Sequence, residues 1–93
     1  MRLEWLRQAL RKLDDEATHI ASDDPLAAQL AVDRFLKAVA QLADQPGLGR
    51  PGRVPGTREL VVLRTRYVVP YRVRGEAIQI LRVFHTSRRL PGK

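Results

Sequence analysis

The chain has 93 residues, enough for one small domain spanning residues 1–93, and 44% of them are apolar, as in a globular protein. It carries a net charge of +7, has no cysteine, and its two histidines lie far apart in the sequence. This composition excludes disulfides and thiolate zinc sites, and it predicts neither a metal site nor a cofactor.

The charge is divided unevenly along the chain. Residues 1–45 carry 6 Lys or Arg and 8 Asp or Glu, whereas residues 46–93 carry 11 basic and 2 acidic residues, so that the second half has a net charge of +9. Of the 17 basic residues 14 are Arg, whose planar guanidinium suits bidentate pairing with phosphate or carboxylate. A half with this charge should attract a nucleic acid or an acidic protein.

Nothing in the sequence predicts contact with a membrane. No apolar stretch approaches the roughly 18 residues that a membrane span requires. The N-terminus also lacks the order of basic, apolar and small residues that marks a signal peptide. We therefore expect a cytoplasmic protein.

The N-terminal half predicts a short strand followed by two helices. Residues 1–4 are read as the strand. Apolar residues then recur three and four positions apart, which predicts an amphipathic helix. Its expected core face consists of Leu6, Leu10, Leu13, Ala17 and Ile20.

A break at residues 22–25 separates this helix from a second one. Asp24 is a suitable N-cap, and Pro25 suits the first helical position. A short connection between two helices predicts an antiparallel helical hairpin. The expected core face of the second helix consists of Ala28, Val32, Phe35, Val39 and Leu42, widened by Leu36 and Ala40.

Residues 45–56 predict a loop that ends the second helix. The stretch "PGLGRPGRVPG" holds 3 of the 6 prolines and 4 of the 6 glycines, which interrupt regular structure. Arg50 and Arg53 lie within it, so the loop could also serve as a basic arm.

The remaining sequence alternates with period two, as strands do. Tyr67, Val69 and Tyr71 share one face, and residues 77–84 alternate in a second run. Tight links at residues 64–65 and 74–75 predict a meander of three antiparallel strands. Pro70 cannot donate to a ladder, which indicates an edge or a bulge. The predicted fold class is α+β, with the short N-terminal strand and the antiparallel helical hairpin packed on a small antiparallel sheet.

One reaction is chemically open to this chain, namely RNA cleavage by attack of a 2′-hydroxyl on the adjacent phosphate. It requires a base, an acid and cations that stabilise the developing charge. His85 titrates near neutrality and is a candidate base or acid, although a surface or capping role is the alternative. Candidate cations and proton donors are Arg58, Arg82, Arg88, Tyr67 and Tyr71.

The arginines of the second half predict a basic contact surface on the sheet and its flanks. The alternative is a solvated face without a partner. Few aromatic residues accompany the arginines, so the sequence does not indicate base stacking. The expected surface consists of Arg50, Arg53, Arg58, Arg64, Arg66, Arg72, Arg82, Arg88 and Arg89.

Four segments taken together resemble a known family. They are "PGLGRP", "PGTREL", "YVVPYRV" and "IQILRVFHTSRR". With the predicted short strand and helical hairpin, they resemble the RelE/ParE superfamily, the toxins of bacterial type II toxin–antitoxin modules, over nearly the whole chain. The resemblance implies a small basic toxin that inhibits growth. It also implies a cognate antitoxin that wraps an acidic segment around the toxin.

The superfamily divides by target. Its RelE-like branch cleaves mRNA on the ribosome, and its ParE-like branch poisons DNA gyrase. The resemblance implies a phosphate-stabilising role for Arg58, and it places His85 near the last-strand catalytic residue of the ribonucleases. The sheet contains no lysine, however, and "PYRVRG" and "ILRVFH" with the following "RR" resemble the ParE branch more closely.

We therefore interpret the chain as a ParE-like toxin that inhibits DNA gyrase by binding. A RelE-like ribonuclease, with Arg58, Arg82 and His85 at its centre and the ribosome and mRNA as partners, is the alternative. A non-toxic basic nucleic-acid-binding domain is a third reading. The protein is an enzyme if it is a RelE-like endoribonuclease, and it is not an enzyme if it is a ParE-like gyrase inhibitor.

Overall fold

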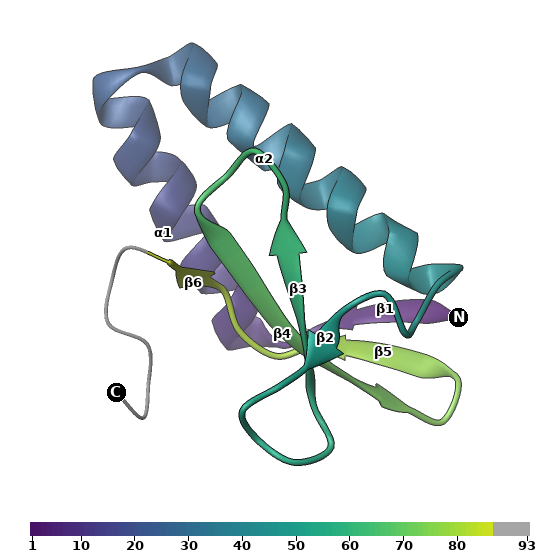
Figure 1. The fold of residues 1–93 in the computed structure, drawn as a ribbon. Helices are drawn as coiled ribbons and strands as arrows, with labels where there is room; N and C mark the ends of the chain where they lie inside the picture. The colour runs from purple at the N-terminus through teal and green to yellow at the C-terminus, as the bar shows by residue number, and fades with distance from the viewer. Residues whose placement is uncertain (87–93) are drawn as a thin grey trace.

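The computed structural model describes residues 1–86 as two helices laid on one face of a sheet (Figure 1). Within these residues, no helix has the length and apolar character needed to cross a membrane. The elements are β1 (Arg2–Trp5), α1 (Arg7–Asp23), α2 (Pro25–Ala40), the 3-10 turn η1 (Gln41–Ala43), β2 (Arg50–Pro51), β3 (Arg58–Val62), β4 (Tyr67–Arg74), β5 (Ala77–Ile80) and β6 (Phe84–His85). This arrangement confirms the predicted α+β fold.

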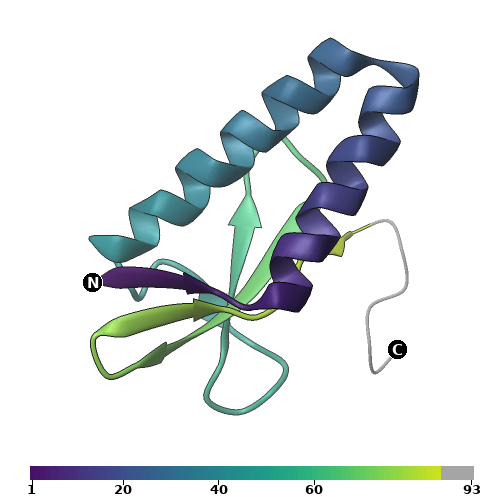
Figure 2. The same cartoon turned by 180° about the vertical axis from the view of Figure 1, so that it is seen from behind.

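The strands form one mixed sheet in the order β1-β5-β4-β3-β2, and β6 also pairs with β4. β3, β4 and β5 make the predicted antiparallel meander. β1 pairs in parallel with β5, from Arg2 opposite Ala77 to Trp5 opposite Ile80, so that the first strand lies beside one of the last (Figure 2). The sequence pattern did not predict this parallel pair, because no turn links β1 to its neighbour.

The junction between the helices follows from the local sequence. The side chain of Asp24 accepts a hydrogen bond from the Ala27 N–H at 3.1 Å, and Pro25 is the first residue of α2. The Asp24 N–H donates to the Ile20 carbonyl at 2.9 Å. One residue therefore ends α1 and begins α2, which confirms the predicted N-cap and antiparallel hairpin.

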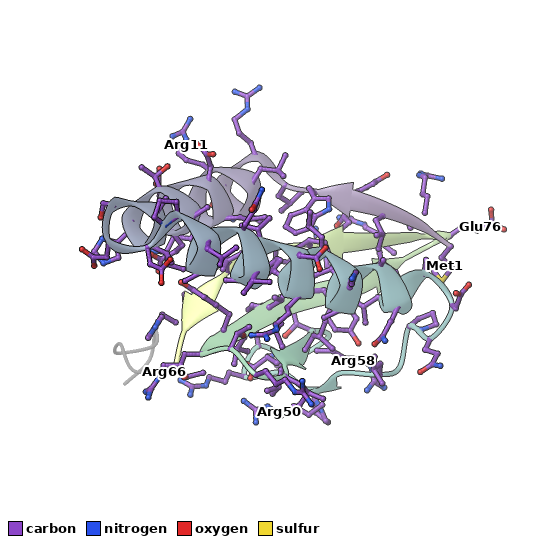
Figure 3. The ribbon with its side chains drawn as sticks, turned by 90° about the horizontal axis from the view of Figure 1, so that it is seen from above. Met1, Arg11, Arg50, Arg58, Arg66 and Glu76 are labelled. Carbon is purple, nitrogen blue, oxygen red and sulfur yellow. The ribbon has the colours of Figure 1, made fainter. Side chains whose placement is uncertain are left out.

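The core lies between the hairpin and the sheet, as the view from above shows (Figure 3). Phe35 of α2 is 1% exposed, and its ring centroid lies 5.9 Å from that of Trp5 and 6.3 Å from that of Tyr67. The hairpin is thereby joined to both β1 and β4. The buried core cluster consists of Ala9, Phe35, Val39, Leu42, Leu60, Val62, Tyr67, Val69, Tyr71, Ile78, Ile80 and Val83.

The predicted core faces are confirmed in part: Phe35 and Val39 of α2 are buried, and Leu13 and Ile20 of α1 pack against the core. In α1, Leu10 is 49% exposed, whereas Ala9 and Glu16 are buried. In α2, Leu36 is 47% exposed and Ala40 is exposed as well. Ala9 and Glu16 lie beside Leu13 and Ile20 on the core side of α1, and a charged Glu does not mark such a position as buried in the sequence pattern.

The last predicted strand, residues 77–84, is interrupted where it passes Pro70 of β4. β5 ends at Ile80, residues 81–83 leave the sheet, and β6 resumes pairing with β4 at Phe84. The Pro70 carbonyl accepts a hydrogen bond from the Leu81 N–H at 2.9 Å. Because the N and C=O of one strand residue point to the same side, the missing N–H of Pro70 faces this interruption and not β3.

Candidate functional site

The fold distributes the predicted basic surface over several places. Strand register puts Arg50 and Arg72 on the sheet face away from the helices, opposite Glu59 and Gln79 respectively. Arg58 pairs with the core residue Tyr71 and so lies on the helix side. The other members lie in loops or beyond the described residues: Arg53 before β3, Arg64 and Arg66 between β3 and β4, Arg82 between β5 and β6, and Arg88 and Arg89 outside residues 1–86.

A row of polar side chains crosses the sheet on the face away from the helices. The Arg72 Nε donates to the Gln79 Oε1 at 2.7 Å, and the Gln79 Nε2 donates to the Glu4 Oε1 at 3.2 Å. The Arg2 Nη2 lies 3.1 Å from the Glu4 Oε2. The row links β4, β5 and β1, so Arg72 also has a structural role.

The carboxyl group of Glu4 should make stability depend on pH. The hydrogen bond from Gln79, and then that from Arg2, hold the pKa of Glu4 below its usual 4.5. A lowered pKa adds stability that is present above 4.5 and is lost as pH falls through the folded-state pKa. Glu4→Gln keeps an acceptor for Gln79 but removes the charge. We expect the stability difference between wild type and Glu4→Gln to shrink on acidification, as measured by urea unfolding at several pH values. A difference that does not change with pH would contradict this assignment.

Arg58 and Tyr71 together fix the loop before β2. The Arg58 Nη1 donates to the Gly49 carbonyl at 2.8 Å. The Tyr71 hydroxyl donates to the Pro46 carbonyl at 2.7 Å and accepts from the Gly49 N–H at 2.8 Å. Tyr71 is fully buried, so it is not placed to donate a proton to a substrate. Both residues therefore have clear structural roles.

The loop between β2 and β3 is held in a similar way by Glu59, which is 8% exposed. Its carboxylate accepts from the Arg50 Nη2 at 3.3 Å and from the Arg53 N–H at 3.2 Å. The Gly52 N–H donates to the Thr57 carbonyl at 2.8 Å. The basic loop is thus tied to the sheet in this structure and does not extend from it as an arm.

The residues considered for RNA cleavage do not converge on one point: Tyr67 and His85 are in contact, with ring centroids 5.2 Å apart, but Arg58 lies elsewhere on the sheet. Arg58 pairs with Tyr71 at one part of β4, and His85 pairs with Tyr67 on the other side of the same strand. These β4 positions are four residues apart, which corresponds to roughly 13 Å at about 3.3 Å per residue. Arg82 is exposed in the segment between β5 and β6. The backbone does not bring Arg58 and His85 to one phosphate.

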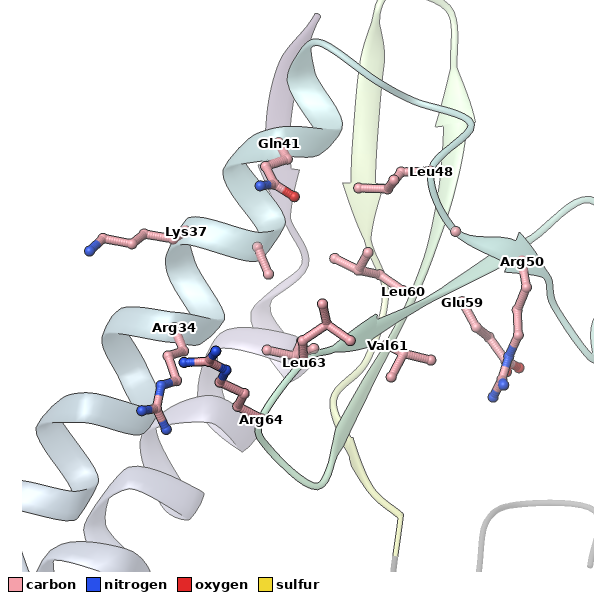
Figure 4. Close-up of a pocket in the computed structure, with 13 residues that line it drawn as sticks. Arg34, Lys37, Gln41, Leu48, Arg50, Glu59, Leu60, Val61, Leu63 and Arg64 are labelled. Atoms are coloured by element: carbon pink, nitrogen blue, oxygen red, sulfur yellow. The ribbon is translucent and has the colours of Figure 1, made fainter.

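A groove of about 580 Å³ lies between α2 and β3 (Figure 4). Leu48, Val61 and Leu63 line it and are 44%, 43% and 78% exposed. These residues were not among the predicted site residues. The apolar run "LVVL" was a signal for them, because an alternating strand must place some of its apolar side chains on the outer face. The cationic residues lining this α2–β3 groove are Arg34, Lys37, Arg50 and Arg64, and Glu59 contributes a carboxylate that is paired with Arg50.

The same groove borders an open stretch of the edge of β3. β2 pairs only with Arg58 and Glu59, so among residues 1–86 the segment 60–62 has β4 on one side and no strand on the other. Pro70 lies opposite Glu59 but directs its carbonyl away from β3, so Glu59 and Pro70 form a non-hydrogen-bonded pair. Hydrogen-bonded and non-hydrogen-bonded pairs alternate along an antiparallel ladder, so Val61 and Val68, two positions away, form another non-hydrogen-bonded pair. The N–H and C=O of Val61 therefore point outward from the sheet. An extended segment could pair with them.

The described residues offer no group of three or more His, Cys, Asp or Glu side chains that could hold a metal ion. Their binding features are cationic side chains, apolar grooves and an open strand edge. Such features suit contacts with another macromolecule.

The comparisons assign this small two-layer fold to a class of toxins. The family model for the ParE toxin of type II toxin–antitoxin system, parDE, matches residues 3–90. The chain belongs to this family. It is 43% identical over 90 residues to the protein named "Putative toxin Y4kP" from Sinorhizobium fredii (strain NBRC 101917 / NGR234), covering 97% of this chain and 93% of the relative.

Solved structures agree with this assignment. A structure titled as the chromosomal ParDE TA system from P. aeruginosa matches with a TM-score of 0.83 and 38% identity, over 91% of this chain and 95% of the other. The toxin–antitoxin complex RelBE2 from Mycobacterium tuberculosis matches with a TM-score of 0.58 and 26% identity, over 90% and 95%. The predicted superfamily and the preference for its ParE branch are confirmed, and the reading as a non-toxic nucleic-acid-binding domain is set aside.

Proposed function

We propose that this ParE-family toxin stops growth in the cytoplasm by binding DNA gyrase and does not cleave RNA. The position of Arg58 carries the proposal. Its guanidinium is bonded to the loop carbonyl of Gly49, and its strand position lies far along β4 from that of His85. A ribonuclease needs its cation, base and acid around one phosphate, because each must act on the same transition state.

The alternative, a ribonuclease, has one observation in its favour. His85 is only partly buried and lines a second groove together with Arg64 and Arg66. This arrangement supplies a titratable group beside two cations without Arg58. Ribonuclease activity would then depend on His85. The variant His85→Ala should therefore lose ribonuclease activity but keep gyrase inhibition.

Expression of the chain by itself should therefore stop DNA synthesis before RNA or protein synthesis and produce filamentous cells. Purified protein should inhibit supercoiling by gyrase, and His85→Ala should retain both effects, because gyrase inhibition needs no proton transfer by the toxin. Pulse labelling of DNA, RNA and protein after induction measures the order. An immediate stop in translation with cleaved mRNA, abolished by His85→Ala in a folded protein, would instead establish the ribonuclease.

We also propose that a cognate antitoxin neutralises the toxin. Both structural relatives are toxin–antitoxin systems by their titles. The α2–β3 groove supports such a partner, because it combines exposed apolar residues, four cationic residues and the open edge of β3. An acidic, partly apolar segment of the antitoxin matches these properties in charge and polarity.

A further inference from the structure

The fold brings the two histidines of the chain to one groove, although 65 residues separate them in the sequence. His19 of α1 and His85 of β6 both line a groove of about 400 Å³ between the helical hairpin and the β3–β4 turn. Arg34, Arg64 and Arg66 line it as well. We call this the His19–His85 groove. Arg34 and Arg64 also line the α2–β3 groove, so the two grooves adjoin.

The positive charge in this groove is not balanced by the residues around it. No Asp or Glu among residues 1–86 lines the groove. Arg34, Arg64 and Arg66 make no ion pair with any described residue. Figure 4 shows the side chains of Arg34 and Arg64 extending toward each other from α2 and the turn. Like charges repel, and an anion placed between them would relieve that repulsion.

The backbone at Arg64 is a second, independent observation. A hydrogen bond from the Thr65 N–H to the Val62 carbonyl, at 3.2 Å, closes the turn, and Arg64 has a φ of 63°. Gly or Asn adopts this left-handed conformation at lower cost than Arg. An unfavourable residue at such a position suggests a functional constraint, here a guanidinium directed to the groove.

The other residues of the groove and its surroundings indicate which class of anion would fit. Ile20, Ala27, Leu30 and Ala31 form an apolar wall on the hairpin side. Asp23 and Asp24 lie at the end of the hairpin and would repel a nucleic-acid backbone that passed over it. A carboxylate flanked by apolar side chains fits the cations and the wall together.

We propose that the His19–His85 groove binds an acidic side chain, with its apolar neighbours, from a segment of the antitoxin. The identity of the partner rests on the toxin function proposed above, whereas the chemistry of the groove does not. Because this groove adjoins the α2–β3 groove through Arg34 and Arg64, one segment can occupy both in succession.

The two histidines provide a specific probe of this site. The chain has no other histidine, so the histidine ring C–H signals in the NMR spectrum of the untagged protein report on this groove alone. The probes are a peptide of repeated Leu-Glu-Glu-Leu units, the same peptide with Gln in place of Glu, and a short single-stranded oligonucleotide. We expect the acidic peptide to shift both histidine signals saturably and the Gln peptide to bind more weakly.

Arg64→Asn tests the contribution of the turn without endangering the fold, because Asn tolerates the left-handed backbone. It should weaken binding of the acidic peptide roughly fivefold, as expected for loss of one partly exposed ion pair. Arg11→Gln removes the same charge from the exposed surface of α1 and should not change binding. Equal binding of the Gln peptide, stronger binding of the oligonucleotide, or no shift of either histidine with any probe would overturn the proposal.

Growth arrest separates this result from the proposed function. If wild type and Arg64→Asn both arrest growth with DNA synthesis stopping first, the proposed function stands whatever the peptide does. If neither arrests growth but the peptide still shifts the histidine signals, the groove binds carboxylates while the toxin function fails.

Discussion

Phe35→Asp should leave the protein unfolded under native conditions. Phe35 is 1% exposed and contacts aromatic rings from both β1 and β4. Loss of a buried Phe side chain typically costs about 3–5 kcal/mol. The new carboxylate would be buried without a partner, which adds several kcal/mol more. The total approaches or exceeds the whole stability of a small domain, about 5–15 kcal/mol. Circular dichroism and urea titration measure the result.

The neighbouring position provides a matched control. Leu36 is 47% exposed, so Leu36→Asp places the same charge in water one residue further along α2. This variant should fold and change stability by less than about 1 kcal/mol. A cooperative, native-like urea transition for Phe35→Asp would remove Phe35 from the core.

Gly49→Ala should cause the second large loss. A Cβ at Gly49 would lie 2.6 Å from the Tyr71 Cε1 and 2.8 Å from the Glu59 carbonyl oxygen. Tyr71 is fully buried and hydrogen-bonded through its hydroxyl, so neither neighbour can yield easily. Overpacking of this kind costs about 1–3 kcal/mol, and disturbing the Tyr71 hydrogen bonds adds to the loss. The measurement is the free energy of unfolding in urea.

Gly47→Ala is the corresponding control in the same loop. A Cβ at Gly47 meets nothing within 4 Å. The substitution should therefore leave stability unchanged or raise it by about 0.4–1 kcal/mol, because Ala restricts the unfolded chain. If the two substitutions have equal effects, close packing around Gly49 is not what fixes this loop.

Local signals in the sequence were sufficient for the helices and the meander. Asp24 and Pro25 define the hairpin by capping chemistry alone, and the period-two alternation around Tyr67–Tyr71 defines β4. What the sequence could not supply were effects of long-range packing. The burial of Glu16 and the parallel pairing of β1 depend on elements distant in the chain.

The candidate site was less predictable for the same reason. Their residue types identified Arg58 and His85 as candidates for RNA cleavage. Only the strand register showed that they lie beside β4 at different positions. The hydrogen bond from Arg58 to Gly49 has no sequence signature. His19 was not among the predicted site residues, because nothing in the sequence of α1 indicates that it shares a groove with His85.

The parallel pairing of β1 with β5 constrains when this toxin can form during synthesis. β1 is translated well before its partner strand, Ala77–Ile80. Ile78 and Ile80 of β5 also belong to the core. A nascent chain cannot complete its sheet until β5 has been translated. Fragments that end before Ala77 therefore lack both the partner of β1 and part of the core.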